Sequence, residues 1–183
     1  MEPVESVIEK AAGAIIDEAG INALKVDALT LKMGIPKSEL STYFKNEEDI
    51  LKFLALRLAN EIQQLIDNLV AMHHGPEKEL SDLFTGLDDF FNRKSYFLEL
   101  MFADVIHKND PAVQVNLFGI RKAVGNHLAQ IIEQGKETGV FSSHMDTRLE
   151  VESILNRFRF FMSDIPMTHK MIRDLKMFRE NRE

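Results

Sequence analysis

The spacing of its apolar residues is the feature that most constrains this chain. Its 5 prolines and 9 glycines leave long uninterrupted stretches. Within them, apolar residues recur at intervals of three and four, the period of one helix face, rather than at the interval of two typical of strands. Val4, Ile8 and Ile15, for example, share one face of a stretch that ends at Gly20, a residue that favours a helix terminus. The sequence therefore predicts an all-α fold of about nine helices.

Capping residues mark where several of these helices begin. Asn46 and Asp146 can accept hydrogen bonds from the first turns of the fourth and eighth helices. Glu47, Glu48 and Asp49 then place negative charge at the positive end of the fourth helix. The predicted helices span residues 4–19, 26–33, 36–44, 47–73, 80–91, 96–106, 111–136, 146–163 and 166–179.

The aromatic residues are distributed unevenly along the chain. Of 13 phenylalanines, only Phe44 and Phe53 precede position 84. A small amino-terminal part therefore has mainly smaller apolar side chains, whereas the remainder is rich in Phe and Met. These large apolar side chains must form a core or enclose a ligand. We predict an N-terminal three-helix headpiece over residues 1–46 and a C-terminal helical bundle over residues 47–183.

The overall composition excludes several classes of protein. With 183 residues and 45% hydrophobic content the chain can bury a core, and its lack of cysteine excludes disulfides, thiolate metal sites and cysteine nucleophiles. The start MEPVESVIEK lacks the pattern of a signal peptide, and no apolar run reaches the roughly 18 residues of a membrane span. We therefore expect a cytoplasmic protein that does not enter a membrane. The net charge of −7 argues against binding polyanions over the whole surface, but not against a local basic patch.

The segment around Gly34 predicts a DNA-reading motif. Two short helices joined through a glycine turn form a helix-turn-helix, whose second helix can lie in the major groove of DNA. Residues 20–51, GINALKVDALTLKMGIPKSELSTYFKNEEDIL, resemble the N-terminal region of the tetracycline-repressor (TetR) family of bacterial transcription regulators. The residues that carry the resemblance occur in order and without gaps: Gly20, Val26, Leu29, Gly34, Ile35, Lys37, Leu40, Tyr43 and Phe44.

The resemblance implies a function and an assembly. It implies an all-helical homodimer whose headpieces read a pseudo-palindromic operator and whose bodies bind a small ligand. The chain is then expected to be a repressor, in which ligand binding shifts the fourth helix and releases the DNA. The last two helices of the family usually pair with a second subunit, which implies a dimer interface at Ile154, Leu155, Phe158 and Phe161.

The headpiece offers side chains suited to DNA contact. Hydroxyls can bond to phosphates or bases, and lysines can contact the phosphate backbone. Together with the resemblance, this gives the candidate DNA-binding residues Lys25, Val26, Lys37, Ser38, Ser41, Thr42, Tyr43 and Lys45. Without the resemblance, the polar residues among them would be interpreted as an ordinary solvated face. Leu40 and Phe44 are expected in the headpiece core.

The charge of the headpiece counts against strong DNA binding. Residues 1–45 contain five lysines and seven acidic residues, a net of −2, and no arginine precedes Arg57. DNA-binding surfaces are normally basic, and arginine makes the commonest specific contact with guanine. Lys25, Ser41 and Glu47 also stand where the family usually has threonine or serine, tyrosine, and lysine. The alternative is therefore a TetR-fold ligand-binding or protein-interaction module with weak or lost DNA binding.

The Phe and Met residues of the body are the candidates for a ligand site. Flexible Met and flat Phe side chains would enclose a hydrophobic or aromatic small molecule. At helical spacing, however, such residues are more often plain core. The candidates are Phe84, Phe91, Phe97, Met101, Phe102, Phe118, Phe158 and Met162.

No catalytic, metal or cofactor site is predicted. The six histidines are scattered, and the adjacent His73 and His74 point in different directions on a helix. The sequence contains no glycine-rich phosphate loop and no recognisable arrangement of nucleophile, base and acid. We therefore expect a binding protein without a cofactor rather than an enzyme.

Overall fold

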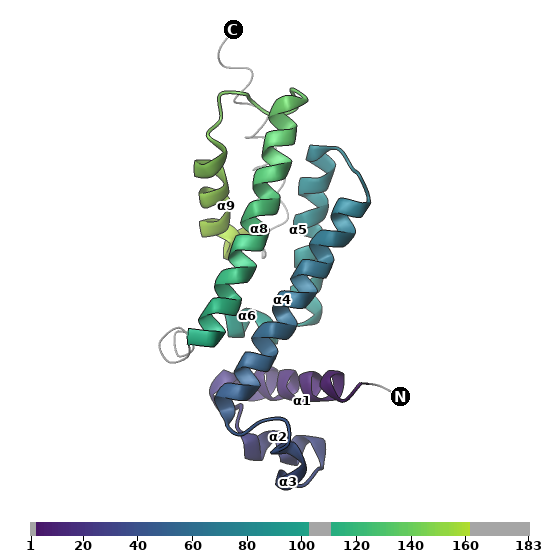
Figure 1. Ribbon diagram of the computed structural model, residues 1–183, viewed down its shortest axis with the longest axis vertical. Coiled ribbons are helices and arrows are strands. Elements are labelled where there is room, and N and C mark those ends of the chain that lie inside the picture. The colour runs from purple at the N-terminus through teal and green to yellow at the C-terminus, as the bar shows by residue number, and fades with distance from the viewer. Residues whose placement is uncertain (1–2, 103–110, 162–183) are drawn as a thin grey trace. The chain divides into compact units, whose positions relative to one another are not determined.

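The computed structural model describes residues 3–102 and 111–161, and the side chains of the last helix as far as residue 157. All regular structure within these ranges is helical, which confirms the predicted all-α fold (Figure 1). None of the helices described there is both long and apolar enough to cross a membrane. The predicted helix over residues 166–179 lies outside the described residues. The helices are α1 (Val4–Ala19), the short 3-10 helix η1 (Ile21–Ala23), α2 (Val26–Met33), α3 (Lys37–Leu40), α4 (Glu47–Ala71), α5 (Pro76–Arg93), α6 (Tyr96–Phe102), α8 (Pro111–Glu137) and α9 (Thr147–Phe161).

The second helix of the helix-turn-helix is shorter than predicted. The sequence predicts a helix that continues to Phe44, but α3 ends at Leu40. The N–H groups of Tyr43 and Phe44 both donate to the carbonyl of Leu40, at 3.0 Å each, so the chain turns tightly. The hydroxyls of Ser41 and Thr42 donate to carbonyls three residues earlier. Such side-chain bonds offer the backbone an alternative to a longer helix.

The chain divides into two compact units. Unit 1 consists of Met1–Asn60 with Phe91–Phe118, and unit 2 of Glu61–Phe90 with Gly119–Glu183. The single helix α4 therefore contributes its first part to unit 1 and its second part to unit 2. The functional boundary after residue 46 stays a prediction.

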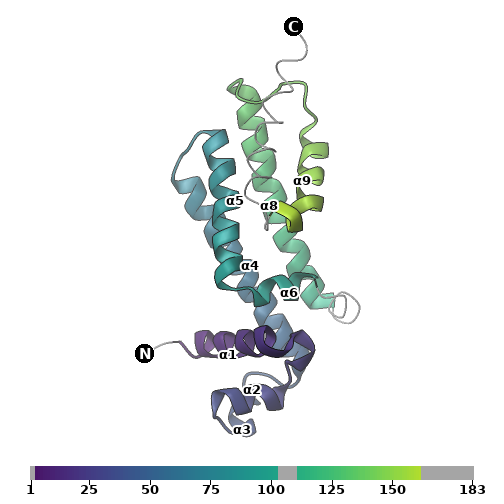
Figure 2. The ribbon, with the colours of Figure 1, turned by 180° about the vertical axis from the view of Figure 1, so that it is seen from behind.

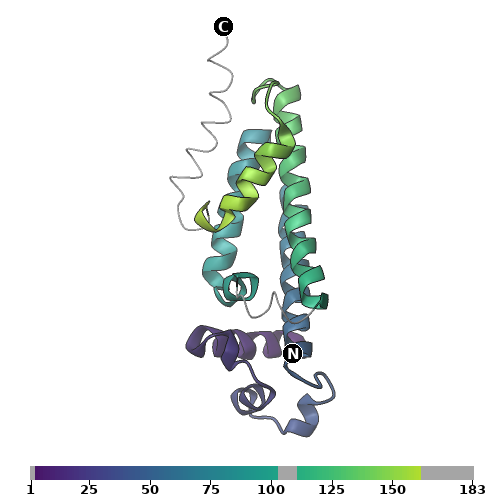
Figure 3. The same cartoon turned by 90° about the vertical axis from the view of Figure 1, so that its left-hand side faces the viewer.

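Apolar side chains of the first helices form the core of the amino-terminal part of unit 1. Leu29 and Leu40 are 0% exposed and Phe44 is 6% exposed, which confirms the core positions predicted for Leu40 and Phe44. Gly34 ends α2 with φ at 67°, a left-handed conformation that glycine adopts without strain, and its N–H donates to the carbonyl of Leu31. This is the turn predicted for the helix-turn-helix. Figure 3 shows α1, α2 and α3 close together in this part of the chain.

A buried carboxylate links three elements of unit 1. Glu9 in α1 is 3% exposed. Its oxygens accept hydrogen bonds from Nε of Arg57 in α4 (2.8 Å), Nζ of Lys94 just before α6 (2.6 Å) and Oη of Tyr96 in α6 (2.7 Å). Burial favours the neutral acid, but the hydrogen bonds from Lys94, Tyr96 and Arg57 outweigh it and hold the pKa of Glu9 below its ordinary value. The ionised Glu9 therefore ties α1 to α4 and to α6.

Further contacts hold α6 against the headpiece helices of unit 1 (Figure 2). The ring of Tyr96 lies directly against Gly13 of α1, where an added Cβ would come within 2.6 Å of the ring. Oε1 of Glu99 accepts the N–H of Ile21 at 2.7 Å. Although α6 follows α5 in sequence, it thus packs with the first helices of the chain.

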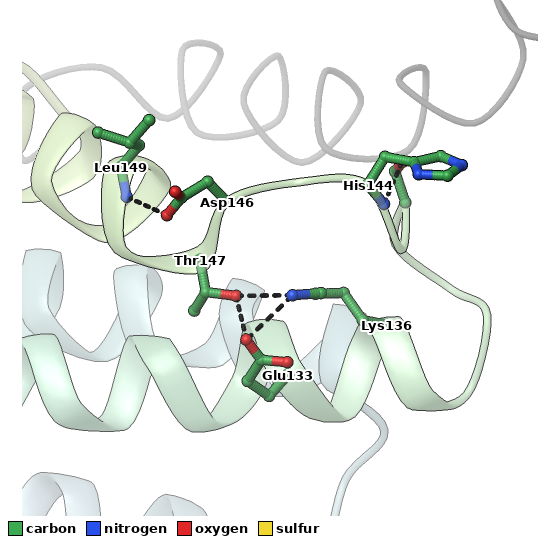
Figure 4. A network of polar contacts seen from close by, with 7 residues as sticks. Glu133, Lys136, His144, Asp146, Thr147 and Leu149 are labelled. Carbon is green, nitrogen blue, oxygen red and sulfur yellow. Dashed lines mark hydrogen bonds and ion pairs between the residues drawn. The ribbon is translucent and has the colours of Figure 1, made fainter.

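In unit 2, a polar network fixes the connection between α8 and α9 (Figure 4). Oδ1 of Asp146 accepts the N–H of Leu149 at 3.1 Å, which confirms the predicted cap. The hydroxyl of Thr147 donates to Glu133, and Nζ of Lys136 donates to Glu133 (3.0 Å) and to Thr147 (3.1 Å). The first turn of α9 is therefore held to the last turns of α8.

We predict that Glu9→Gln lowers the free energy of unfolding by about 2–4 kcal/mol, because Arg57 and Lys94 would remain partly buried without their anion. Equilibrium unfolding in urea measures this change. The control is Glu18→Gln, which breaks an exposed ion pair with Lys32 and should change little. A Glu9→Gln protein as stable as the parent would contradict the role assigned to Glu9.

The same substitution should alter the response to acid. Because the pKa of Glu9 is lower in the folded state, its ionised form stabilises the fold fully above the ordinary pKa that the group has in the unfolded chain. That stabilisation is lost as the pH falls through the folded pKa. The stability of Glu9→Gln should therefore decline less steeply in acid, as thermal unfolding between about pH 3 and pH 7 would show. Parallel curves for parent and variant would contradict this assignment.

Candidate nucleic-acid interface

Most of the predicted DNA-binding side chains lie on the surface of unit 1. Val26 is the exception, because it is only 8% exposed and belongs to the core at the start of α2. The prediction for Val26 is therefore corrected, since a side chain covered by protein cannot reach DNA. Seven candidates are exposed: Lys25, Lys37, Ser38, Ser41, Thr42, Tyr43 and Lys45.

The short helix α3 has one buried anchor and an outward polar surface. Pro36 precedes it in an extended conformation (φ −69°, ψ 148°), which brings the chain out of the turn and into the helix. Leu40 points into the core and is 0% exposed. Lys37, Ser38 and Ser41 are exposed around it. The arrangement gives unit 1 a compact polar face that could approach a nucleic acid.

Two hydroxyls of this face, those of Ser41 and Thr42, are already hydrogen-bonded to the backbone. Oγ of Ser41 donates to the carbonyl of Ser38 at 2.7 Å, and Oγ1 of Thr42 donates to the carbonyl of Glu39 at 2.7 Å. A phosphate oxygen only accepts hydrogen bonds, so it needs a free donor. These two hydroxyls would have to rotate away from the backbone before they could bind a phosphate.

The lysines of the face differ in their partners. Nζ of Lys37 lies 2.7 Å from Oδ1 of Asp27, and the hydrogen bond to that carboxylate raises the pKa of Lys37. Lys37 therefore forms an exposed ion pair, which it must leave before it can contact a phosphate. Lys25 and Lys45 have no carboxylate partner among the residues that the structure describes. They are the cations best placed to meet a phosphate.

α4 begins two residues after Lys45, and two reciprocal hydrogen bonds cap its start. The N–H of Asp49 donates to Oδ1 of Asn46 at 3.0 Å, which confirms the predicted cap. The carboxylate of Asp49 in turn accepts the N–H of Lys45 at 2.9 Å. With Glu47 and Glu48 also in the first turn, this helix end is already satisfied by acids and would repel a phosphate.

Comparison with solved structures identifies the fold. No family model and no curated protein matches the sequence. The structure is similar to the TetR-family regulator PfmR from Thermus thermophilus (TM-score 0.75, 19% identity, covering 97% of this chain and 95% of that one). It is also similar to a TetR-family regulatory protein from Rhodococcus (TM-score 0.77, 14% identity, 96% and 98% covered) and to the regulator FadR from Bacillus subtilis in complex with stearoyl-CoA (TM-score 0.69, 18% identity, 92% and 96% covered). The chain has the TetR fold.

Within this TetR fold, the predicted ligand-site residues do not gather in one unit. Phe84 is buried in unit 2, whereas Phe91 and Phe97 are buried in unit 1 with Met101 and Phe102 half-buried there. Phe118 is 68% exposed, so its assignment to a ligand enclosure is corrected. The side chains of Phe158 and Met162 lie outside the described residues. For the buried residues, the structure is consistent with the plain core that the sequence left as an alternative.

The predicted dimer residues of α9 are partly covered by their own chain. Ile154 is 2% exposed, so it belongs to the core of unit 2 and is corrected as a surface residue. Leu155 is half-buried against Gly125 of α8, where an added Cβ would lie 3.1 Å from its Cδ1. The side chains of Phe158 and Phe161 lie outside the described residues.

The structure gives partners or a buried position to two histidines, His74 and His127, and His127 was not singled out from the sequence. His74 contacts Oδ2 of Asp82 through Nδ1 at 2.8 Å, and no group of three or more potential metal ligands occurs in residues 3–102 and 111–157. His127 of α8 is only 3% exposed and lies 3.4 Å from Glu79 of α5. Its position between apolar residues at helical spacing was the signal that could have found it.

We predict that Asp27→Asn strengthens DNA binding, because it releases Lys37 for contact with a phosphate. One added contact should steepen the slope of log K against log salt by about 0.9. Fluorescence polarisation with duplex DNA at several salt concentrations measures both quantities. In the matched control, Asp27→Asn with Lys37→Ala, the added slope should disappear. A slope increase that persists in this double variant would rule out Lys37 as its source.

Proposed function

We propose that the protein is a TetR-type transcriptional regulator that acts in the cytoplasm as a repressor. In this proposal two copies bind a pseudo-palindromic operator, and a small hydrophobic or aromatic effector releases them. The observation that carries the proposal is the exposed polar face of α3, anchored through Leu40 and joined to α2 by the Gly34 turn, in a chain with the TetR fold. A buried or apolar α3 face would not support it.

The proposal requires the headpiece to attract DNA despite its acidic balance. Lys25 and Lys45 supply the charge, since both are exposed and unpaired among the described residues. Phosphate contacts provide most of the affinity of such interfaces and position the helix that reads the bases. Two lysines per headpiece, doubled in a dimer, favour modest affinity that falls steeply with salt.

A second candidate function is favoured by the electrostatics of the same face. Lys37 is paired with Asp27, Lys32 is paired with Glu18 at 2.6 Å, and the first turn of α4 is acidic. These features support a TetR-fold ligand-binding or protein-interaction module that has lost tight DNA binding. Either function makes the protein a binding protein rather than an enzyme.

The effector is proposed to be hydrophobic because of the composition of unit 2. Its described part buries Leu80, Leu83, Phe84 and Leu87 of α5. One protein of the same fold, the Bacillus subtilis FadR, is in complex with stearoyl-CoA, a ligand with a long apolar chain. We propose that the body of the present protein also takes a ligand with a large apolar part.

The homodimer is proposed to involve an exposed apolar patch on α8. Val115 and Phe118, three residues apart on one helix face, are 69% and 68% exposed. Exposed apolar residues that adjoin one another favour a role in association. In a twofold dimer, each copy would present the same patch to the other.

We predict that changing Lys25 and Lys45 together to alanine weakens binding to the DNA upstream of the protein's own gene and lowers the salt slope by about 0.9 for each lost phosphate contact. Fluorescence polarisation at low salt measures this. Lys37→Ala should have a smaller effect, because Lys37 must first leave its ion pair with Asp27. Lys122→Ala, an exposed lysine of α8, is the control.

The outcomes of this measurement separate the two candidate functions. A loss of binding confined to the headpiece variants supports the repressor. Negligible binding by the parent and all variants contradicts the repressor and supports the module without DNA binding. Equal losses for the headpiece variants and Lys122→Ala would contradict a specific headpiece contact.

For the dimer, we predict a mass in solution of about twice the 21.0 kDa of the chain. Phe118→Lys should shift the mass toward that of one chain, because it places a charge in the proposed patch. Light scattering after size exclusion measures this. Leu31→Lys is a matched control, since Leu31 of α2 is 85% exposed and lies outside the patch. A monomeric parent would contradict the proposed homodimer.

A further inference from the structure

The exposed face of α3 carries a glutamate that was not among the predicted DNA-binding residues. Glu39 is exposed and lies next to the buried anchor Leu40. Its carboxylate has no hydrogen bond or ion pair among the residues that the structure describes. A carboxylate only accepts hydrogen bonds. Glu39 therefore presents free acceptor oxygens to any molecule that approaches this face.

Two hydroxyls of the same face also present acceptors. Oγ of Ser41 donates its hydrogen to the carbonyl of Ser38 at 2.7 Å. Oγ1 of Thr42 donates to the carbonyl of Glu39 at 2.7 Å, so Thr42 lies directly beside Glu39. A hydroxyl has one hydrogen and two lone pairs, so a hydroxyl whose hydrogen is engaged can only accept. Both hydroxyls therefore offer lone pairs rather than hydrogens to a ligand.

Few donors are free on this face. Nζ of Lys37 donates to Oδ1 of Asp27 at 2.7 Å, and no arginine precedes Arg57 in the sequence. Arginine and lysine are the side chains that bond the O6 and N7 acceptors of guanine. The hydroxyls of Ser38 and Tyr43 have no partner among the described residues, but a hydroxyl that can donate or accept favours no particular base. The pattern on α3 is therefore the opposite of that of a helix that reads guanine.

The four bases differ in the groups that they present in the major groove. Guanine presents two acceptors, and thymine presents an acceptor and a methyl group. Adenine presents a donor beside the acceptor N7, whereas cytosine presents its N4 amino group as a donor alone. A carboxylate that faced guanine or thymine would place acceptor against acceptor, and N7 of adenine would oppose it in part. Cytosine is therefore the base whose groove edge matches the carboxylate of Glu39.

We propose that Glu39 is a specificity-determining residue of α3 and reads a cytosine in each half of the operator. The inference rests on the proposed function, because it names the base chemistry that the operator of that function must contain. The carboxylate accepts a hydrogen bond from the N4 amino group of the cytosine. The hydroxyl of Thr42 accepts from the amino group of a neighbouring cytosine or adenine. Lys25 and Lys45, which lie outside α3, supply the phosphate contacts that offset the charge of Glu39.

Selection from a library of duplexes tests which bases the full-length protein prefers. The duplexes carry about 20 randomised base pairs, long enough for two half-sites one helical turn apart. They are bound at low salt, and the retained DNA is sequenced. We expect a C·G pair at one position of each half-site, preferred over a T·A pair by about 5- to 50-fold, because thymine replaces the N4 donor with an acceptor.

Variants of Glu39 test whether this side chain makes the contact. Glu39→Gln should change the preferred base at that position from cytosine to adenine, because the glutamine amide bonds N6 and N7 of adenine. Glu39→Ala should remove the preference at that position. The matched control is Glu48→Gln, which removes the same charge at an exposed position of α4 and should keep the base preference of the parent. Thermal unfolding confirms that each variant is folded.

A modified duplex separates the cytosine from the guanine of the same base pair. In the selected sequence, the guanine opposite the cytosine is replaced by 7-deazaguanine, which lacks the N7 acceptor that a lysine or arginine would use. An unchanged affinity supports contact with the cytosine. A clear loss of affinity would assign the contact to the guanine and would overturn the inference.

The possible failures of the selection are distinguishable. Enrichment of duplexes without a preferred C·G pair would overturn the inference while leaving a DNA-binding regulator intact. The same base preference in the parent and in Glu39→Gln would also overturn the assignment to Glu39. If the parent enriches no duplex even at low salt, both the cytosine contact and the proposed repressor are contradicted.

Discussion

The ionised carboxylate of Glu9 is the interaction on which the arrangement of unit 1 depends. Removing a carboxylate from water is costly unless hydrogen-bond donors replace the water. Here the replacement requires Arg57, Lys94 and Tyr96 to reach α1 together. Because these residues come from α4, the residue pair before α6 and α6 itself, the carboxylate holds α4 and α6 to α1. A displacement of α6 would therefore act directly on α1.

The polar groups on the surface of unit 1 differ in whether they have partners within the protein. Lys37 is paired with Asp27, and the hydroxyl of Ser41 donates to a backbone carbonyl. Lys25 and Lys45, in contrast, have no carboxylate partner among the described residues. The contacts of Lys37 and Ser41 limit how strongly this face can attract a polyanion, so any attraction depends mainly on the other two lysines.

Much of the fold could be predicted from the sequence, because it depends on local interactions. Apolar spacing indicated the helices, and Gly34, Asn46 and Asp146 gave the turn and two caps that the structure confirms. These signals involve residues a few positions apart, so the local sequence is enough to predict the helices, the turn and the caps. The sequence predicted that this helix continues to Phe44, whereas α3 ends at Leu40. The hydroxyl-to-carbonyl hydrogen bonds that compete with the helix there produce no periodic pattern in the sequence.

The sequence by itself determined the helical class, the headpiece motif and most residues of its exposed face. Only the tertiary structure decided that Val26 and Ile154 are core and that Phe118 is exposed. It also brought Glu9 to Lys94 across 85 residues and His127 to Glu79. Periodicity shows that a residue lies on the apolar face of a helix, but its exposure depends on which other element covers that face. Packing between distant segments decides this, and it also decides the partners of buried charges.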